Sequence, residues 1–345
     1  MSELNNEVLP IQWAGDKIIL LDQTALPLEE NYVDITSVDL LVDAIERLVV
    51  RGAPALGAVG AYGVALAMVQ ATRESWSSSE LAENIRRIRD ARPTAVNLAW
   101  GVDKCSPYVA QGLDAVVEQA DLISEADALA NRAMGRVGAD WIEKHVARRP
   151  LRLLTHCNTG TLATTYWGTA LGVIRELHER GLVELVYADE TRPLLQGSRL
   201  TAWELDRAGI NHVVAADGAA SSTILRGLVD VALIGADRIA ANGDSANKIG
   251  SVGVALACKD AGIPFLVVAP VSTVDLETAS GDDIHIELRA GSEVTMLAGV
   301  QVAPPNTRGF NPAFDVTPAR LISAIITEVG AIEVADGETP NSRLR

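Results

Sequence analysis

The stretch LRLLTHCNTG at residues 151–160 decides the fold, because a short apolar run there ends abruptly in a polar cluster. Helix-length amphipathic segments, such as Thr161–Arg180 and Gly197–Ala208, separate it from later runs of the same kind. Four such runs follow: Val183–Tyr187, His212–Ala216, Val231–Ile234 and Phe265–Val268. Almost wholly apolar runs that alternate with helices are typical of a parallel sheet covered on both faces. The sequence therefore predicts an α/β fold with a Rossmann-like, doubly wound domain.

A polar cluster follows closely after each of these five apolar runs. The clusters are 156–160, 189–192, 217–218, 235–238 and 269–273. Ligands of open α/β sheets bind beyond the carboxyl ends of the strands, where such clusters converge. We therefore expect a ligand site at this edge of the sheet.

The residues before this domain have a different pattern. Ile11–Leu21 is typical of a hairpin with Gly15-Asp16 at its turn. Helical periodicity follows at Val38–Val50, Ala55–Gln70, Ser79–Ala91 and Leu113–Val146, the last long enough to contain a break. We predict a smaller, mainly helical N-terminal domain at 1–122 and a Rossmann-like catalytic domain at 123–345. Within the second domain, 123–147 is expected to be a connecting helix and 336–345 a loosely ordered tail.

The composition restricts the partners. The 345 residues carry a formal net charge of −16, which repels nucleic acid and anionic membrane surfaces, although a few cations can still hold a small phosphorylated substrate. No targeting segment begins the sequence, and no uninterrupted apolar run has membrane-spanning length. We expect a cytoplasmic protein that binds neither nucleic acid nor a membrane.

The motifs give no sign of a metal or cofactor. The three cysteines, Cys105, Cys157 and Cys258, are widely spaced and contain no C-x-x-C pair, which argues against a disulfide framework or a zinc site. Neither a Walker loop nor a G-x-G-x-x-G fingerprint is present. We predict no metal and no nucleotide.

Cys157 is the candidate activated thiol or oxyanion contact. It ends the first run and precedes a predicted helix, and helix N-termini lower thiol pKa values and bind anions. The alternative is a buried core cysteine, the interpretation that we give to Cys258. His156 should point to the opposite face of the strand from Cys157, so we interpret it as structural.

Asp237 is the candidate general acid. The small residues Gly235 and Ala236 let the backbone before it pass close to a ligand, and a dehydrated pocket would raise its pKa toward neutrality. The alternatives are a helix N-cap or a salt bridge to Arg238.

Three further segments supply hydrogen-bond donors. Arg51-Gly52-Ala53-Pro54 should begin a helix and could present backbone N–H groups and a guanidinium to an anion, but a plain helix start fits equally well. The segments beginning at Arg92 and Gln196 add donors at element boundaries, although each alone is typical of a solvated loop. For Glu190 and Arg192 we favour a local ion pair over a substrate clamp.

Six motifs together carry a resemblance. They lie at 50–57, 92–98, 155–160, 189–200, 235–249 and 311–318. In this order they resemble the methylthioribose-1-phosphate isomerase family, which also contains sister sugar-phosphate isomerases and the alpha, beta and delta regulatory subunits of translation initiation factor 2B. The resemblance extends from the N-terminal hairpin to about Ile326.

The resemblance implies a cofactor-independent aldose–ketose isomerase of methionine salvage, and a homodimer. It implies that Cys157 and Asp237 are catalytic. The substrate contacts that it implies are Arg51, Gly52, Ala53, Arg92, Gln196, Asn247 and Lys248. A regulatory subunit would lack the Cys157 and Asp237 pair.

Four segments depart from the family pattern, and they place the pocket for the sugar's C5 substituent in question. They are 209–211, 217–220, 248–252 and 284–289. A 5-deoxyribose 1-phosphate isomerase is therefore an alternative. A ribose 1,5-bisphosphate isomerase should need a second cationic cluster, which the sequence does not offer.

Overall fold

The protein divides into two compact units in a computed structural model that describes residues 8–92 and 96–344. Unit 1 comprises the chain up to Arg132 together with Gly160–Gly168, and unit 2 comprises Ala133–Thr159 and Thr169–Arg345. The predicted boundary at 122/123 therefore lies before the observed one, in the same helix. The return of Gly160–Gly168 to unit 1 was not predicted.

Unit 1 packs a small antiparallel sheet on a group of helices. Its elements are β1 (Ile11–Trp13), β2 (Ile18–Leu21), β3 (Tyr32–Ile35), α1 (Val38–Glu46), α2 (Ala53–Glu74), α3 (Ser78–Asp90), α4 (Val96–Cys105), η1 (Ser106–Gln111), the first part of α5 (Leu113–His145) and η2 (Thr161–Ala163). The strands pair in the order β1-β2-β3, which confirms the predicted hairpin. Ser77 and Glu80 form the capping box that begins α3. The long helix α5 runs without the break that its length allowed.

Helix α2 is the centre of the unit 1 core. It is long and apolar enough to cross a membrane by length and composition, which the sequence analysis did not expect, but 78% of its most apolar window is buried in the protein. Alanines and glycines along α2 let its neighbours approach closely: a Cβ atom at Gly60 would lie 2.5 Å from the carbonyl oxygen of Leu98 in α4. This burial is the pattern of a core helix.

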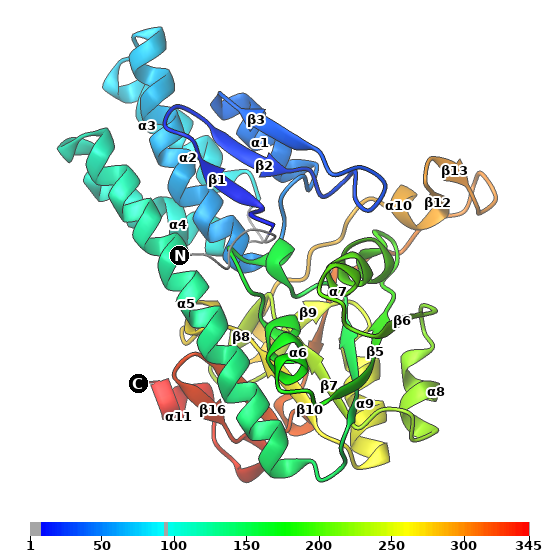
Figure 1. The fold of residues 1–345 in the computed structure, drawn as a ribbon. Helices are drawn as coiled ribbons and strands as arrows, with labels where there is room; N and C mark the ends of the chain where they lie inside the picture. Colours follow the sequence, from blue (N-terminus) through cyan, green and yellow to red (C-terminus); the bar gives the residue numbers. More distant parts are fainter. Residues whose placement is uncertain (1–7, 93–95, 345) are drawn as a thin grey trace. The chain divides into compact units, whose positions relative to one another are not determined.

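Unit 2 contains the predicted doubly wound sheet (Figure 1). Its sheet strands are β4 (Leu151–His156), β5 (Val183–Asp189), β6 (His212–Ala215), β7 (Val231–Ile234), β10 (Phe265–Val268), β15 (Ala324–Thr327) and β16 (Gly330–Ile332). They pair in the order β16-β15-β10-β7-β4-β5-β6, and all pairs are parallel except β15 with β16. All five predicted strands are present. The last two were not predicted.

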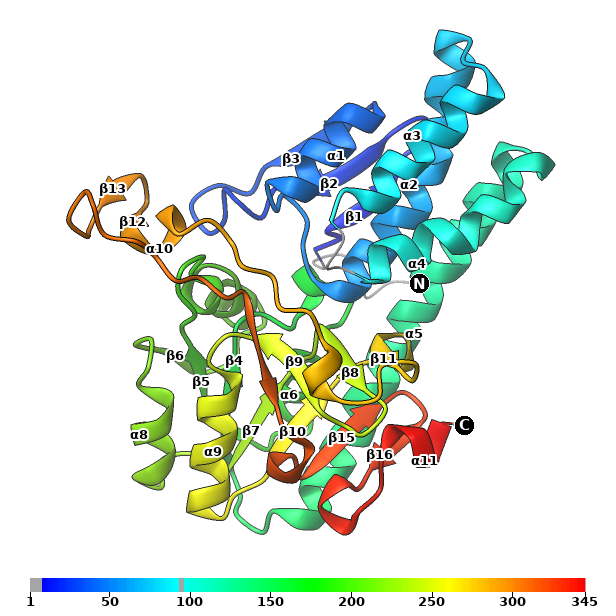
Figure 2. The same ribbon diagram turned by 180° about the vertical axis from the view of Figure 1, so that it is seen from behind.

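Helices cover both faces of this sheet (Figure 2). The helical elements of unit 2 are the end of α5, α6 (Ala170–Glu179), the π-helical turn η3 (Gly197–Thr201), α7 (Ala202–Arg207), α8 (Ala220–Leu225), α9 (Ser251–Ala261), η4 (Val271–Thr273), η5 (Gly281–Asp283), α10 (Ser292–Thr295), η6 (Ala319–Leu321), η7 (Val334–Asp336) and α11 (Pro340–Leu344). Leu153 and Leu233 pack with α5 and α6, while Leu154 and Ile234 pack with α8 and α9. Alternate residues of each strand thus enter two separate cores.

A second, four-stranded sheet lies at the carboxyl side of β7. It contains β8 (Arg238–Ala240), β9 (Ser245–Lys248), β11 (Val274–Asp275) and β14 (Phe314–Thr317), in the order β11-β8-β9-β14. A separate hairpin joins β12 (Met296–Leu297) to β13 (Val300–Gln301). The second sheet carries two of the predicted substrate contacts, Asn247 and Lys248, on β9.

Two predictions about local structure are wrong. The chain end is ordered up to residue 344: Pro340 is buried, and the backbone N–H of Asn341 donates to the carbonyl of Ala241 at 3.1 Å. The helix expected over Thr161–Arg180 begins only at Ala170. Hydroxyl side chains accompany the second error: the Thr164 hydroxyl donates to the carbonyl of Gly160, and the Thr165 hydroxyl donates to Asp127.

Candidate active site

The ends of β4 and β7 bring the two predicted catalytic segments together. These strands are parallel neighbours with Thr155 opposite Leu233, so the residues that follow them leave the sheet side by side. The contact is tight, because a Cβ atom at Gly235 would lie 2.9 Å from the Cγ2 atom of Thr159. Cys157 and Asp237 therefore belong to adjacent strand ends on one edge of the sheet.

Cys157 lies in a strained, buried turn. Its φ of +64° is in the left-handed region, which residues with a side chain rarely adopt, and it is 8% exposed. The hydroxyl of Thr201 donates to its carbonyl oxygen at 2.6 Å. The next residue, Asn158, donates to Glu204 at 2.9 Å and to the Thr201 hydroxyl at 3.2 Å. Side chains from η3 and α7 thus hold the turn.

The reason given for an activated thiol at Cys157 is wrong. Only the three-residue 3-10 helix η2 follows Gly160, and the next α-helix, α6, begins at Ala170, after the segment Gly160–Gly168 has passed through unit 1. The N-terminus of an α-helix therefore does not directly follow the thiol. What the structure supplies instead is a buried thiol in a turn with a left-handed φ of +64°. Cys105 and Cys258 are fully buried, and burial raises their pKa values to about 11 and about 12, as expected of core thiols.

Asp237 is placed by the pairing of β8 and β9. Its backbone N–H donates to the carbonyl of Ala246 at 2.9 Å, and Arg238 lies opposite Ala246 in the ladder. Extending this antiparallel register by one residue sets Asp237 across from Asn247. Arg238 also lies 3.6 Å from Asp275, with which it forms an ion pair.

Asn247 and Lys248 are buried polar residues at the end of β9. The Asn247 amide donates to the hydroxyl of Ser251 at 2.9 Å. The Lys248 ammonium group donates to the carbonyl of Ala313 at 3.0 Å and lies 5.1 Å from the centre of the Phe314 ring. Burial of an amide and an ammonium group is costly unless they are hydrogen-bonded, so these contacts fix both side chains.

Gln196 is held at the start of the π-helical turn. It is 4% exposed, and its side-chain oxygen accepts a hydrogen bond from the Thr191 hydroxyl at 2.7 Å. The turn packs closely, because a Cβ atom at Gly197 would lie 2.4 Å from the carbonyl oxygen of Asp189. Single π-helical turns often occur at functional sites.

The predicted ion pair between Glu190 and Arg192 is wrong. Glu190 accepts from the backbone N–H groups of Thr191 at 2.9 Å and Ser198 at 3.3 Å. The Arg192 guanidinium donates to the carbonyl of Val294 at 2.8 Å. Glu190 thus holds nearby backbone, whereas Arg192 holds the backbone of a segment distant in sequence.

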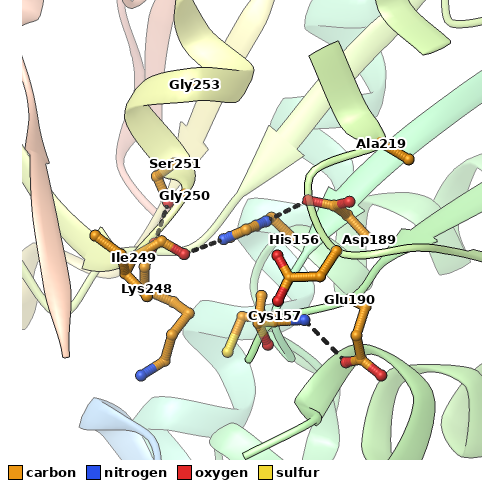
Figure 3. Close-up of polar contacts among 12 residues, drawn as sticks. His156, Cys157, Asp189, Glu190, Ala219, Lys248, Ile249, Gly250, Ser251 and Gly253 are labelled. Atoms are coloured by element: carbon orange, nitrogen blue, oxygen red, sulfur yellow. Dashed lines mark hydrogen bonds and ion pairs between the residues drawn. The ribbon is translucent and has the colours of Figure 1, made fainter. Parts of the chain in front are cut away.

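His156 makes contacts that sequence reasoning did not anticipate (Figure 3). Its Nδ1 lies 2.6 Å from Asp189 and its Nε2 lies 2.9 Å from the carbonyl of Ile249. Burial opposes a charged ring, but Asp189 and the carbonyl outweigh it and raise the pKa of His156. Burial likewise raises the pKa of Asp189, against the effect of His156. Asp189 stood in a predicted polar cluster, but no spacing rule linked it to His156.

The remaining predicted contacts belong to unit 1. Helix α2 begins at Ala53 with Gly52 as its N-cap and a proline in its first turn, as predicted. Gly52 has a φ of +99°, and a Cβ atom there would lie 2.5 Å from the carbonyl oxygen of Ala163. Packing alone therefore requires glycine at this position. Arg51 and Arg92 belong to the same unit, whereas the residues after Arg92 in its motif, 93–95, lie outside the described part of the chain.

Within residues 8–92 and 96–344, no group of three or more histidine, cysteine, aspartate or glutamate side chains could hold a metal ion.

Comparison with known proteins places the chain in a family. Residues 49–334 match the model of the initiation factor 2 subunit family. The chain belongs to this family. A "Methylthioribose-1-phosphate isomerase" of Pelotomaculum thermopropionicum is 48% identical over 94% of this chain and 90% of its own length. The resemblance indicated by the sequence motifs is thereby confirmed.

A second relative is longer than this chain. It is a "Probable bifunctional methylthioribose-1-phosphate isomerase/methylthioribulose-1-phosphate dehydratase" of Nocardia farcinica, 49% identical over 97% of the chain. The chain spans only 61% of that relative's length.

Solved structures share the whole fold. A 5-methylthioribose 1-phosphate isomerase from Pyrococcus horikoshii OT3 superposes with a TM-score of 0.85 at 37% identity, covering 99% of this chain and 95% of its own. A structure described as translation initiation factor eIF-2B, subunit delta, from A. fulgidus has a TM-score of 0.81 at 40% identity, covering 94% and 96%. Fold alone therefore does not separate the two functions of the family, and the site residues must.

Proposed function

We propose that this chain is a methylthioribose-1-phosphate isomerase that converts 5-methylthio-D-ribose 1-phosphate into 5-methylthio-D-ribulose 1-phosphate in the cytoplasm, in methionine salvage. The observation that carries the proposal is the arrival of a buried thiol, Cys157, and a carboxyl group, Asp237, at adjacent strand ends. The near-full-length similarity to enzymes of that name supports the same substrate.

Asp237 begins the reaction as a general acid. The phosphate on O1 prevents the sugar from opening as a free hemiacetal does, so Asp237 donates a proton to O4 while the C1–O4 bond breaks. C1 is left electron-deficient and keeps its phosphate. The ring oxygen becomes the hydroxyl group on C4.

Hydrogen then moves from C2 to C1. In a hydride shift, C2 delivers hydrogen with its electron pair to C1, the O2 proton leaves, and Cys157 stabilises the developing charge. In the enediol route, Cys157 removes the C2 proton, C1 is reprotonated, and the O2 proton leaves as the C2 ketone forms. Both routes give a C2 ketone and a C1 methylene group without changing the overall composition. Deuterium placed at C2 is retained in the product by the first route and exchanged with water in the second.

An assay with three substrates tests the function. The 5-methylthio, 5-deoxy and 5-phospho forms of ribose 1-phosphate should be compared by kcat/KM, with the 5-methylthio sugar expected to be preferred. Preference for the 5-deoxy sugar would reassign the substrate within the same chemistry. No turnover of any of the three, together with stable association with other subunits of the initiation factor 2B type, would refute the enzyme assignment.

The active form is a homodimer in this proposal. Several apolar side chains on one segment of unit 2 are exposed, and a second copy would bury them. They are Leu288 (68%), Val300 (64%), Val302 (58%) and Phe310 (80%). Sedimentation equilibrium should give twice the mass of the chain, and substitution of Phe310 by Ser should weaken that association.

A further inference from the structure

The His156 ring connects two segments that carry site residues. It ends β4 and immediately precedes Cys157, while its hydrogen-bond partner Ile249 immediately follows Lys248 at the end of β9. The other partner, Asp189, ends β5. His156 and Asp189 are each 3% exposed, so water does not compete for these contacts.

The chemistry of the two partners fixes what the ring does. A backbone carbonyl only accepts hydrogen bonds, so Nε2 must carry a proton and donate to Ile249. Nδ1 is occupied by the Asp189 carboxyl group at 2.6 Å. With both nitrogens engaged in buried hydrogen bonds, the ring has no free position at which to exchange a proton with a substrate.

The ring also fills the space beside the turn that it holds. A Cβ atom at Gly250 would lie 2.8 Å from Cε1 of His156, so only glycine lets the turn approach this closely. On the other side of the turn, the N–H groups of Gly250 and Val252 donate to one oxygen of Asp315, at 2.8 and 3.2 Å. The turn is thus held by Asp315 through its N–H groups and by His156 through its carbonyl.

We propose that His156 is a positioning residue, which sets Asn247 and Lys248 relative to Cys157 by clamping the Ile249 carbonyl to the end of β4. This proposal rests on the proposed function, because that function makes Asn247 and Lys248 contacts of a phosphosugar. Figure 3 shows the ammonium group of Lys248 and the sulfur of Cys157 on the same side of the site, away from the ring.

Two substitutions at His156 test its two hydrogen bonds separately. Glutamine at position 156 reaches the place of Nε2 and can still donate to Ile249, whereas asparagine reaches only the place of Nδ1. We expect His156→Asn to lower kcat/KM by about 10- to 100-fold, mainly through a higher KM, because misplacement by about 1 Å costs up to about 100-fold. His156→Gln should stay within about threefold of the wild type.

His212 supplies the matched control, because its Nδ1 also lies close to a backbone carbonyl, that of Ile210, at 2.8 Å. His212→Gln should leave both kinetic constants unchanged. Wild-type constants in His156→Asn would overturn the proposal. Equal losses in the Asn and Gln variants would also overturn it, since a general structural role predicts no rescue.

Amide hydrogen exchange tests the clamp without any substrate, so failure of the proposed function remains distinguishable. Exchange in peptides that cover 247–252 should accelerate in His156→Asn and in Gly250→Ala, which displaces the ring without altering it. The control is Gly262 at the other end of α9, which has a φ of +68° and open space around its Cβ position. Gly262→Ala should not change exchange in the peptides that cover 247–252. Unchanged exchange at 247–252 in both test variants, or acceleration throughout the protein, would overturn the proposal.

Discussion

Replacing Thr201 by valine tests whether the strained turn at Cys157 is held by its side-chain contacts. The substitution keeps the shape of the side chain but removes the hydroxyl that donates to the Cys157 carbonyl at 2.6 Å. Thr201 is 1% exposed, and its hydroxyl donates to the Cys157 carbonyl in the described part of the chain. An orphaned buried carbonyl costs about 1–3 kcal/mol of unfolding free energy. Asn158 would keep its stronger bond to Glu204.

The same change should affect catalysis. A residue with a side chain adopts left-handed φ values at a cost of about 1–2 kcal/mol, so without its hydroxyl anchor Cys157 gains by relaxing toward extended backbone. Each 1.36 kcal/mol lost in the transition state lowers the rate about tenfold, and we expect kcat to fall by about tenfold or more.

Urea unfolding and steady-state kinetics of the Thr201→Val and Thr201→Ser variants measure both effects. Serine retains the hydroxyl and should recover most of kcat. The reasoning is refuted by a valine variant that matches the wild type in both unfolding free energy and kcat.

Three other predictions follow from the structure. Asp237→Asn should abolish turnover while phosphosugar binding, measured by calorimetry, persists, because an amide cannot supply the acid proton; retained turnover would remove Asp237 from the mechanism. Gly52→Ala should lower the urea midpoint more than Gly112→Ala, because both have φ near +100° but only Gly52 faces Ala163; equal losses would mean that the close contact is unimportant. Burial raises the pKa values of the core thiols Cys105 and Cys258 from 9.0 to about 11 and about 12. Below pH 9 both thiols therefore make their full contribution to the unfolding free energy. Their contribution should be lost between pH 9 and 12, because the unfolded thiols ionise first; a double alanine variant with the same alkaline decline in urea midpoint would contradict this.

The strands of the sheet were predictable because burial on both faces makes a strand almost wholly apolar. Val231–Ile234 and Phe265–Val268 have this pattern, and both are fully buried. β15 is equally apolar, but the chain then turns back into the antiparallel edge strand β16 instead of entering a helix. A search for alternating strands and helices passes over such a hairpin.

Other features depend on contacts that no local pattern encodes. The apolar periodicity after Gly160 favours a helix, yet Gln23 donates to the carbonyl of Leu162 at 2.7 Å and Gly52 packs on Ala163. These long-range contacts override local propensity. The left-handed turn at Cys157 had no signal either, since glycine or asparagine normally marks that conformation. Motif resemblance supplied the candidate residues, while the register of β4, β7, β8 and β9 explains how they are placed.

The detour of Gly160–Gly168 into unit 1 has a consequence for the order of events during synthesis. The N–H of Thr169 bonds the carbonyl of Thr159 at 2.8 Å, so the excursion leaves and re-enters unit 2 at one point. Ribosomes release the chain from its N-terminus. Unit 1 cannot complete its core until residue 168 has emerged from the ribosome. By then β4 has already emerged and can pair with other strands. Nascent-chain intermediates arrested before that length should therefore remain sensitive to protease around Gln23 and Gly52.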